Sequence, residues 1–148
     1  MTIKTFKGQI ANGEQQTIRL STNNGLTGYK IVKLQSMLIE IGASDEEHVI
    51  QIFSTERTSA IPTANATVNF DDPTLLGVVM SSAGSNARIY PEDHNVVFDN
   101  KVINQDIYIT HTDNEGSAGV NYYLELEQVK LDLNEATVAT LKDMRGRE

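Results

Sequence analysis

The sequence contains no cysteine and no tryptophan, and only 3 of its 148 residues are proline. Without cysteine, a disulfide framework, a thiolate metal site and a thiol nucleophile are excluded, so packing has to stabilise the fold. Apolar runs are too short to cross a membrane, and residues 1–7 lack the basic-then-apolar order of a signal peptide. We therefore expect a soluble, unprocessed protein whose length fits one domain.

Positive charge is also scarce, because 12 Lys and Arg face 20 Asp and Glu, a net charge of −8. Like charges repel, so we expect neither nucleic acid nor an anionic membrane as a partner. Residues 1–40 carry five Lys and Arg against two acids (+3), and the remainder carries seven against eighteen (−11). A positive edge and an acidic body favour head-to-tail contacts between copies, although a solvated surface explains the same pattern.

β-Branched residues dominate what is present, and apolar residues alternate with polar ones between short turns rich in Gly and Asn. This pattern predicts eight strands, at residues 3–10, 17–21, 29–41, 49–55, 75–81, 95–99, 103–112 and 120–131. Residues 102–131 indicate a long twisted β-hairpin, and residues 56–74, which hold two prolines, indicate an excursion over the surface. We expect an all-β fold, an antiparallel β-sandwich of jelly-roll or related Greek-key type.

One helix is predicted, at residues 134–145, with Asn134 as its N-cap. It follows an expected sandwich domain at residues 1–133 and forms, with the tail to residue 148, part of that domain or a subunit-contact element. Its apolar stripe is too narrow for independent stability, so the helix must dock on its own sandwich or on another subunit. The candidate subunit contact comprises Val138, Leu141 and Arg145.

Alternation also assigns the faces of the predicted hairpin. Its core face consists of Ile107, Ile109, Tyr122, Leu124 and Leu126. Its solvent face offers a candidate partner or ligand surface at Tyr108, Tyr123, Glu125 and Glu127. Residues 29–41 are apolar on both faces, which indicates a central strand, or a bent strand that serves two sheets or packs against a neighbouring subunit.

We find no catalytic, cofactor-binding or metal-ligating set in the sequence. The three histidines are His48, His94 and His111. They lie in separate segments, which favours solvent-facing or hydrogen-bonded side chains over metal ligands, and Asp113 near His111 is explained by turn geometry. The acidic groups at 45–47 and 71–72 lack the spacing of a calcium loop and are interpreted as solvated loops. We expect a non-enzymatic protein without cofactors; a hydrolase with an unfamiliar site is the least favoured alternative.

Three segments carry a resemblance to a family. They are NNGLTGYKIVK at 23–33, NKVINQDIYITH at 100–111 and NYYLELEQVKLDLNEATVATLKDMR at 121–145. The chain resembles small virion structural proteins of marine tailed phages over nearly its whole length, apart from residues 56–74 and 82–95. The resemblance implies a capsid-associated, decoration or connector protein of the virion, assembled in the host cytoplasm. Its implied partners are copies of itself, as a trimer or another cyclic homo-oligomer, and other virion proteins; no site residue is carried over.

A carbohydrate-binding module is the main alternative, because a β-sandwich can present an aromatic platform flanked by polar side chains. Tyr108 and Tyr123 would lie on adjacent strands of the predicted hairpin and bind a host-surface glycan. The same pair also suits a subunit interface, and a cross-strand aromatic contact that stabilises the hairpin is the favoured explanation.

Overall fold

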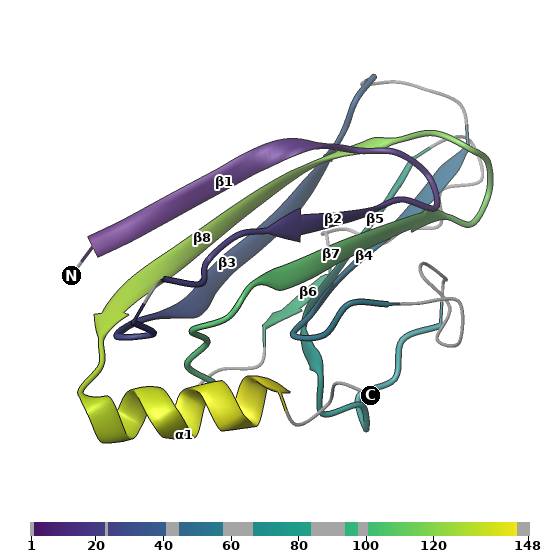
Figure 1. Ribbon diagram of the computed structural model, residues 1–148. Coiled ribbons are helices and arrows are strands. Elements are labelled where there is room, and N and C mark those ends of the chain that lie inside the picture. Colours follow the sequence, from purple (N-terminus) through teal and green to yellow (C-terminus); the bar gives the residue numbers. More distant parts are fainter. Residues whose placement is uncertain are drawn as a thin grey trace.

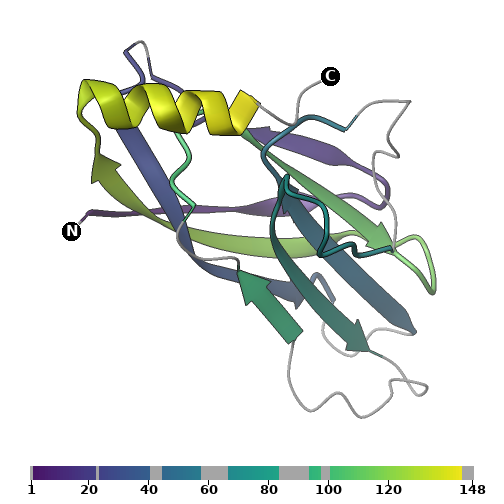
Figure 2. The ribbon, with the colours of Figure 1, turned by 90° about the horizontal axis from the view of Figure 1, so that it is seen from below.

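The computed structural model describes residues 2–22, 24–40, 45–57, 67–83, 94–97 and 101–144, and these form two packed antiparallel sheets and one helix (Figure 1). The strands are β1 (Thr2–Ile10), β2 (Gln15–Ile18), β3 (Thr27–Leu38), β4 (Glu46–Phe53), β5 (Leu75–Ala83), β6 (His94–Val97), β7 (Ile107–Asp113) and β8 (Val120–Lys130). The helix is α1 (Leu133–Met144), which crosses one end of the sandwich (Figure 2). All eight strands expected from the alternation are present, and the antiparallel sandwich is confirmed.

The strand order identifies the topology. One sheet has the order β1-β8-β3, and the other has the order β2-β7-β4-β5-β6. The antiparallel pairs β1–β8, β2–β7 and β4–β5 are nested along the chain, as in a long hairpin rolled into two sheets, which is the pattern of a jelly roll. Within the described residues, β6 continues the larger sheet by pairing with β5.

The predicted hairpin at residues 102–131 is wrong. Its two arms are strands, but β7 pairs with β2 and β4, whereas β8 pairs with β1 and β3 in the other sheet. The connection between them therefore crosses from one sheet to the other (Figure 1). Alternation reports which face of a strand is buried and says nothing about which strand lies beside it, so the arms were predicted correctly and their pairing was not.

The core lies between the two sheets and matches the faces assigned from the sequence. Ile107, Ile109, Leu124 and Leu126 are fully buried, and Ile50 and Ile52 of β4 and Leu34 of β3 join them. Truncation of one such side chain to alanine typically costs about 2–5 kcal/mol, so this cluster stabilises the fold in the absence of disulfides.

Strand β3 is an edge strand of the smaller sheet, so the expectation of a central strand is wrong. A bulge between Ile31 and Lys33 shifts its register against β8 and turns Val32 outwards. On the outer side, Val32, Met37 and the following Ile39 remain exposed, Met37 to 64%. Strand β3 therefore has apolar residues on both faces. Those on the inner face are buried, and those on the outer face are exposed.

The outer face of the larger sheet is covered by the chain itself. Arg57 stacks on the ring of Phe53 at 3.4 Å and forms an ion pair with Asp72 at 2.7 Å, and Gln51 donates from Nε2 to the carbonyl of Thr67. These contacts confirm the expected excursion for residues 56–57 and 67–74, while residues 58–66 lie outside the described part. Because the excursion lies over the larger sheet, outward-facing residues of β4 are buried as well.

The helix docks through small residues. Ala136 and Ala139 pack on Leu131, with Leu26, Val102 and Val129 around them. The side-chain amide of Asn104 donates to the carbonyl of Ala136, to Thr140 Oγ1 and to the carbonyl of Gly25, which ties α1 to the chain ahead of β3. No helix among the described residues is long and apolar enough to cross a membrane.

The predicted N-cap of the helix is wrong. Asp132, not Asn134, is the N-cap, because its Oδ1 accepts from the backbone N–H of Glu135 at 2.7 Å. The stripe of Val138 and Leu141 does not dock on the sandwich, since these side chains are 51% and 60% exposed. Arg145, the third residue of the predicted subunit contact, lies outside the described residues.

Candidate functional site

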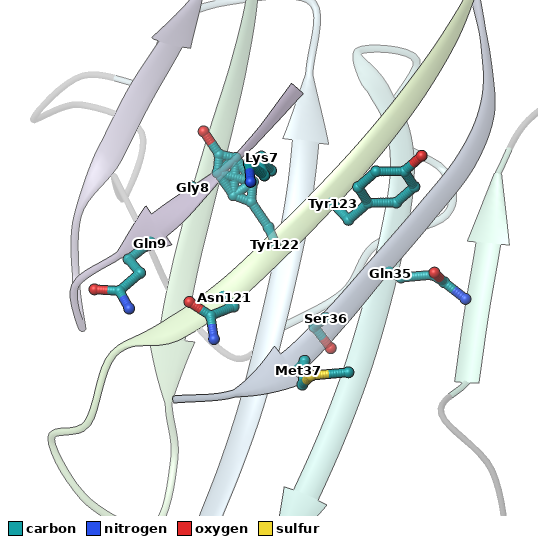
Figure 3. A pocket seen from close by; sticks show the side chains of 9 residues that line it. All are labelled: Lys7, Gly8, Gln9, Gln35, Ser36, Met37, Asn121, Tyr122 and Tyr123. Carbon is teal, nitrogen blue, oxygen red and sulfur yellow. The ribbon is translucent and has the colours of Figure 1, made fainter. Parts of the chain in front are cut away.

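The outer face of the β1-β8-β3 sheet, hereafter the outer face, is centred on Tyr123. The register places Lys7 of β1 on one side of Tyr123 and Gln35 of β3 on the other. One step along the strands, Asn121 lies between Gln9 and Met37. These side chains point to the same side of three neighbouring strands (Figure 3).

A groove of about 630 Å³ runs over this part of the sheet. It is lined by Lys7, Gly8, Gln9, Gln35, Ser36, Met37, Asn121, Tyr122 and Tyr123. Beneath it, the ring of Tyr122 is directed from β8 towards Gly8 of β1, and its hydroxyl donates to Gln16 Oε1 at 3.1 Å (Figure 3). A Cβ at Gly8 would approach that hydroxyl to 3.0 Å, so the missing side chain lets the tyrosine fill the space under β1.

The groove combines an aromatic ring with polar side chains. Tyr123 supplies an aromatic ring, and Gln9, Gln35 and Asn121 supply amides that both donate and accept hydrogen bonds. These groups suit a neutral polar ligand or another polypeptide, and they include no nucleophile paired with a base.

Charges on the rest of the outer face follow the strands. The central strand β8 carries Glu125 and Glu127, and the register sets Lys33 and Lys30 of β3 opposite them. Lys33 Nζ lies 4.0 Å from Glu125 Oε2. The acidic centre of the outer face is therefore partly balanced by its lysine-bearing edge, and such exposed pairs stabilise a monomer little.

The structure brings together only part of the predicted partner surface. Tyr123, Glu125 and Glu127 share the outer face. Tyr108 lies on β7 in the other sheet, where its register partners are Thr17 and Phe53, so the expected pair of Tyr108 with Tyr123 is wrong. The error follows from the hairpin pairing, because only that pairing would have placed these tyrosines on adjacent strands.

A second cluster is buried at one end of the core. His48 Nδ1 and His111 Nε2 are 2.8 Å apart, and both rings are fully buried. His111 Nδ1 lies 3.2 Å from the carbonyl oxygen of Ala11, and His48 Nε2 lies 2.8 Å from Glu46 Oε1. The expectation of hydrogen-bonded histidines is confirmed for these two, whereas nothing is described for the side chain of His94.

The surroundings of His111 lower its pKa and so favour the neutral imidazole. Burial is the largest cause that lowers its pKa, and the neighbouring His48 lowers it further, against the opposing effects of the Ala11 carbonyl and Asp113. A neutral imidazole has one donor and one acceptor nitrogen, so the neighbours of each nitrogen determine where its proton lies.

Asp113 completes this end of the core. Its Oδ1 accepts from the backbone N–H groups of Glu47, Glu115 and Gly116, and its Oδ2 accepts from Ala118. Burial raises the pKa of Asp113, but these backbone hydrogen bonds outweigh burial and the pKa is lowered overall. The turn geometry expected for Asp113 is thus present, and it holds an ionised carboxylate in the interior.

The sequence contained a signal for this cluster that was missed. Residues 45–47 were interpreted as a solvated loop, which is wrong for Glu46, because it begins β4 and is 8% exposed. Extending the alternation of Ile52 and Ile50 by two further steps reaches His48 and Glu46 on the same inward face. Continuing from Ile107 and Ile109 likewise reaches His111 and Asp113, whose strand β7 lies beside β4.

Comparison with known proteins does not assign the chain to a family. No protein-family model matches the chain, and no curated protein is significantly similar to it. Function therefore has to be inferred from the outer face, the helix and the buried cluster themselves.

Proposed function

We propose that the chain is a non-enzymatic structural protein of a phage particle, of the capsid-associated, decoration or connector type, which acts by self-association and contacts with other virion proteins. The observation that carries the proposal is the exposed apolar surface of the outer face, formed by Val32, Met37 and the following Ile39. Residues of the chain itself lie over the larger sheet, where Val68 and Phe70 of the covering segment are exposed in turn. An uncovered apolar face is typical of an interaction surface.

The edges of the smaller sheet support the same proposal. Strands β1 and β3 flank β8, and each has one side without a strand partner among the described residues, apart from an isolated bridge between Tyr29 and Ile103. Long open edges invite pairing with another chain, and Lys4 and Lys7 on β1 limit unspecific pairing. Such an edge is best suited to pairing with a strand of another subunit in a defined register.

The helix offers a second, different patch. Leu133, Val138 and Leu141 are exposed on α1, at the end of the sandwich. When two unlike patches of one subunit meet head to tail, the contact is heterologous and closes into a ring if the rotation allows it. We therefore favour a cyclic homo-oligomer, with a trimer as the smallest ring of this kind.

The phage assignment rests on the resemblance of residues 23–33, 100–111 and 121–145 to small virion structural proteins. A jelly roll is compatible with it, since this architecture is used in viral capsids and in lectins. The fold alone does not choose between these uses. The virion is accordingly the proposed location, with assembly in the host cytoplasm.

Light scattering coupled to size exclusion tests the proposal. We expect the wild-type chain to elute as a defined oligomer, and a Val32→Glu/Met37→Glu variant to elute as a smaller species with an unchanged melting temperature. The matched control is Val68→Glu, an exposed apolar residue of the excursion. A wild-type chain that stays monomeric at millimolar concentration and does not bind capsids would contradict the proposal.

Carbohydrate binding is the second candidate, favoured by the groove with Tyr123 and its three amides. A glycan array separates it from assembly alone. Tyr123→Ala should abolish saccharide binding, and Tyr108→Ala, on the other sheet, should leave it unchanged. Absence of any saccharide-dependent signal from the wild-type chain would eliminate this candidate.

A further inference from the structure

The hydrogen bonds around the two histidines leave one lone pair facing a carboxylate. The carbonyl of Ala11 can only accept, so Nδ1 of His111 must carry its proton and, in the neutral ring, Nε2 is an acceptor. His48 must then donate from Nδ1 across 2.8 Å. In a neutral His48 this leaves Nε2 without a proton, 2.8 Å from Glu46 Oε1.

Two acceptors cannot face each other at that distance unless a proton or a metal ion lies between them. The three contacts in the row need three protons, and two neutral imidazoles supply two. Either an additional proton occupies the gap between His48 and Glu46, or a metal ion does. The row of contacts is therefore complete only with a third proton or a metal ion at this point of the core.

The carboxyl groups around His48 favour a metal ion over a single proton. The ligating atoms of Glu46, His48 and Asp113 all lie within 4.8 Å of one another, and all three residues are buried. Two carboxyl groups, those of Glu46 and Asp113, thus converge on one imidazole. In the described part of the chain the lysine and arginine ion pairs are made with Glu125 and Asp72, and none reaches this cluster. Buried carboxyl groups are usually paired with a cation or coordinated to a metal ion.

We propose that Glu46, His48 and Asp113 form a binding site for a divalent first-row transition-metal ion such as Zn²⁺. One imidazole nitrogen and two carboxylate oxygens match the donor types that Zn²⁺ accepts, while Ca²⁺ requires six or more oxygens. The second nitrogen of His48 donates to His111, which is how metal-binding histidines are usually oriented. His111 is thus a positioning residue, and a fourth coordination position remains for water.

A metal ion at this site would cross-link the strands at one end of the sandwich. Glu46 and His48 belong to β4, Asp113 ends β7, and His111 anchors the turn after β1 through Ala11. Asn12 in that turn also accepts from the backbone N–H of Asp113. A metal ion here supplies the cross-link between strands that a chain without cysteine cannot obtain from a disulfide.

Ligand atoms bound to Zn²⁺ in a tetrahedral site are about 3.3–3.5 Å apart, given bonds of about 2.0–2.2 Å. Glu46 therefore has to move away from His48 by roughly half an ångström when it exchanges the proton for the metal. Its position at the start of β4, where its side chain is 9% exposed, allows that movement.

The test uses the full chain, stripped with a chelator and titrated with ZnCl₂ by isothermal calorimetry, with thermal unfolding in parallel. Glu46→Gln is the decisive variant, because its amide can donate to His48 Nε2 and satisfy the row of hydrogen bonds while removing a charged ligand. It should fold at least as stably as the metal-free wild type and bind Zn²⁺ at least about tenfold more weakly.

The matched control is Glu115→Gln, an exposed acid of the turn beside Asp113. We expect one Zn²⁺ per chain, with a rise in melting temperature, for both the wild type and this control. Failure of the wild type to bind at 100 µM ZnCl₂, an order-of-magnitude threshold for a preformed site, would overturn the proposal. Equal affinity of Glu46→Gln and the wild type would overturn it as well.

Discussion

His48 and His111 share a hydrogen bond of 2.8 Å between Nδ1 and Nε2, although 63 residues separate them in the chain. Neighbouring strands β4 and β7 bring them together, and both rings face the interior. The core of this sandwich is therefore apolar along most of its length and polar at one end. Buried polar rows of this kind are stabilising only while every member has its partner.

Replacing His111 tests that dependence. His111→Leu removes the acceptor of His48 Nδ1 and the donor to the Ala11 carbonyl, and leaves both groups buried. We expect a loss of about 1–3 kcal/mol in the free energy of unfolding, measured by urea denaturation. The outward-facing neighbour Tyr108→Leu is the control, expected to cost less than about 1 kcal/mol. A His111→Leu variant as stable as the wild type would show that the row does not stabilise the fold.

Asp106 fastens the chain after β2. Its Oδ1 accepts from the backbone N–H groups of Leu20 and Ser21 at 2.8 and 2.9 Å, and from Ser21 Oγ at 3.0 Å. Burial raises the pKa of Asp106, but these hydrogen bonds outweigh burial, so its pKa lies below the ordinary value of 3.8. The carboxylate thus binds its proton more weakly in the folded chain than in the unfolded one.

The sign of the pH effect follows. The stabilisation by Asp106 is fully present above the unfolded pKa of about 3.9 and is lost as the pH falls through the lower folded value. Asp106→Asn should therefore cost about 1–3 kcal/mol at pH 7, and the difference from the wild type should shrink towards pH 2. Urea denaturation at both pH values measures this, with the exposed Asp71→Asn as the control. A difference that stays constant between the two pH values would contradict the prediction.

The strands were predictable and their neighbours were not. Alternation located all eight strands and, in the arms of the predicted hairpin, the buried face with Ile107, Ile109, Leu124 and Leu126, because a period of two residues is imposed locally by the pleat. The partner of β7 depends on how the whole chain closes its two sheets, so the sequence suggested the adjacent β8. The misplaced Tyr108 follows from this, and so does the unforeseen contact between His48 and His111, since each depends on which strands lie side by side. The inward direction of Glu46 and His48, in contrast, follows from the alternation alone.

Gly28 illustrates another constraint that the sequence did not reveal. A Cβ at this position would lie 2.6 Å from Val102 Cγ1 and 3.1 Å from Leu131 Cδ1, in the region where α1 docks. We expect Gly28→Ala to destabilise the chain by about 1–3 kcal/mol through overpacking, measured by thermal or urea unfolding. Val102→Ala removes the atom closest to the new Cβ. The double variant should therefore lose less free energy of unfolding than the sum of the losses of the two single variants. Strict additivity would show that the valine is not the obstacle.

Thr112 has a buried hydroxyl group that we expect to destabilise the fold. Its Oγ1 is buried and has no hydrogen-bond partner among the described residues, and the residue lies opposite Val49 on the outward side of β7 and β4. A buried hydroxyl without a partner costs free energy, and valine has nearly the same shape without the polar atom. Thr112→Val should therefore raise the free energy of unfolding by about 1 kcal/mol, helped by the strand preference of valine. Thr137→Val is the comparison, because its exposed hydroxyl donates to the Leu133 carbonyl within α1 and its replacement should not stabilise the chain. If Thr112→Val lowers the melting temperature instead, the hydroxyl has a partner in solution, such as an ordered water, that compensates its burial.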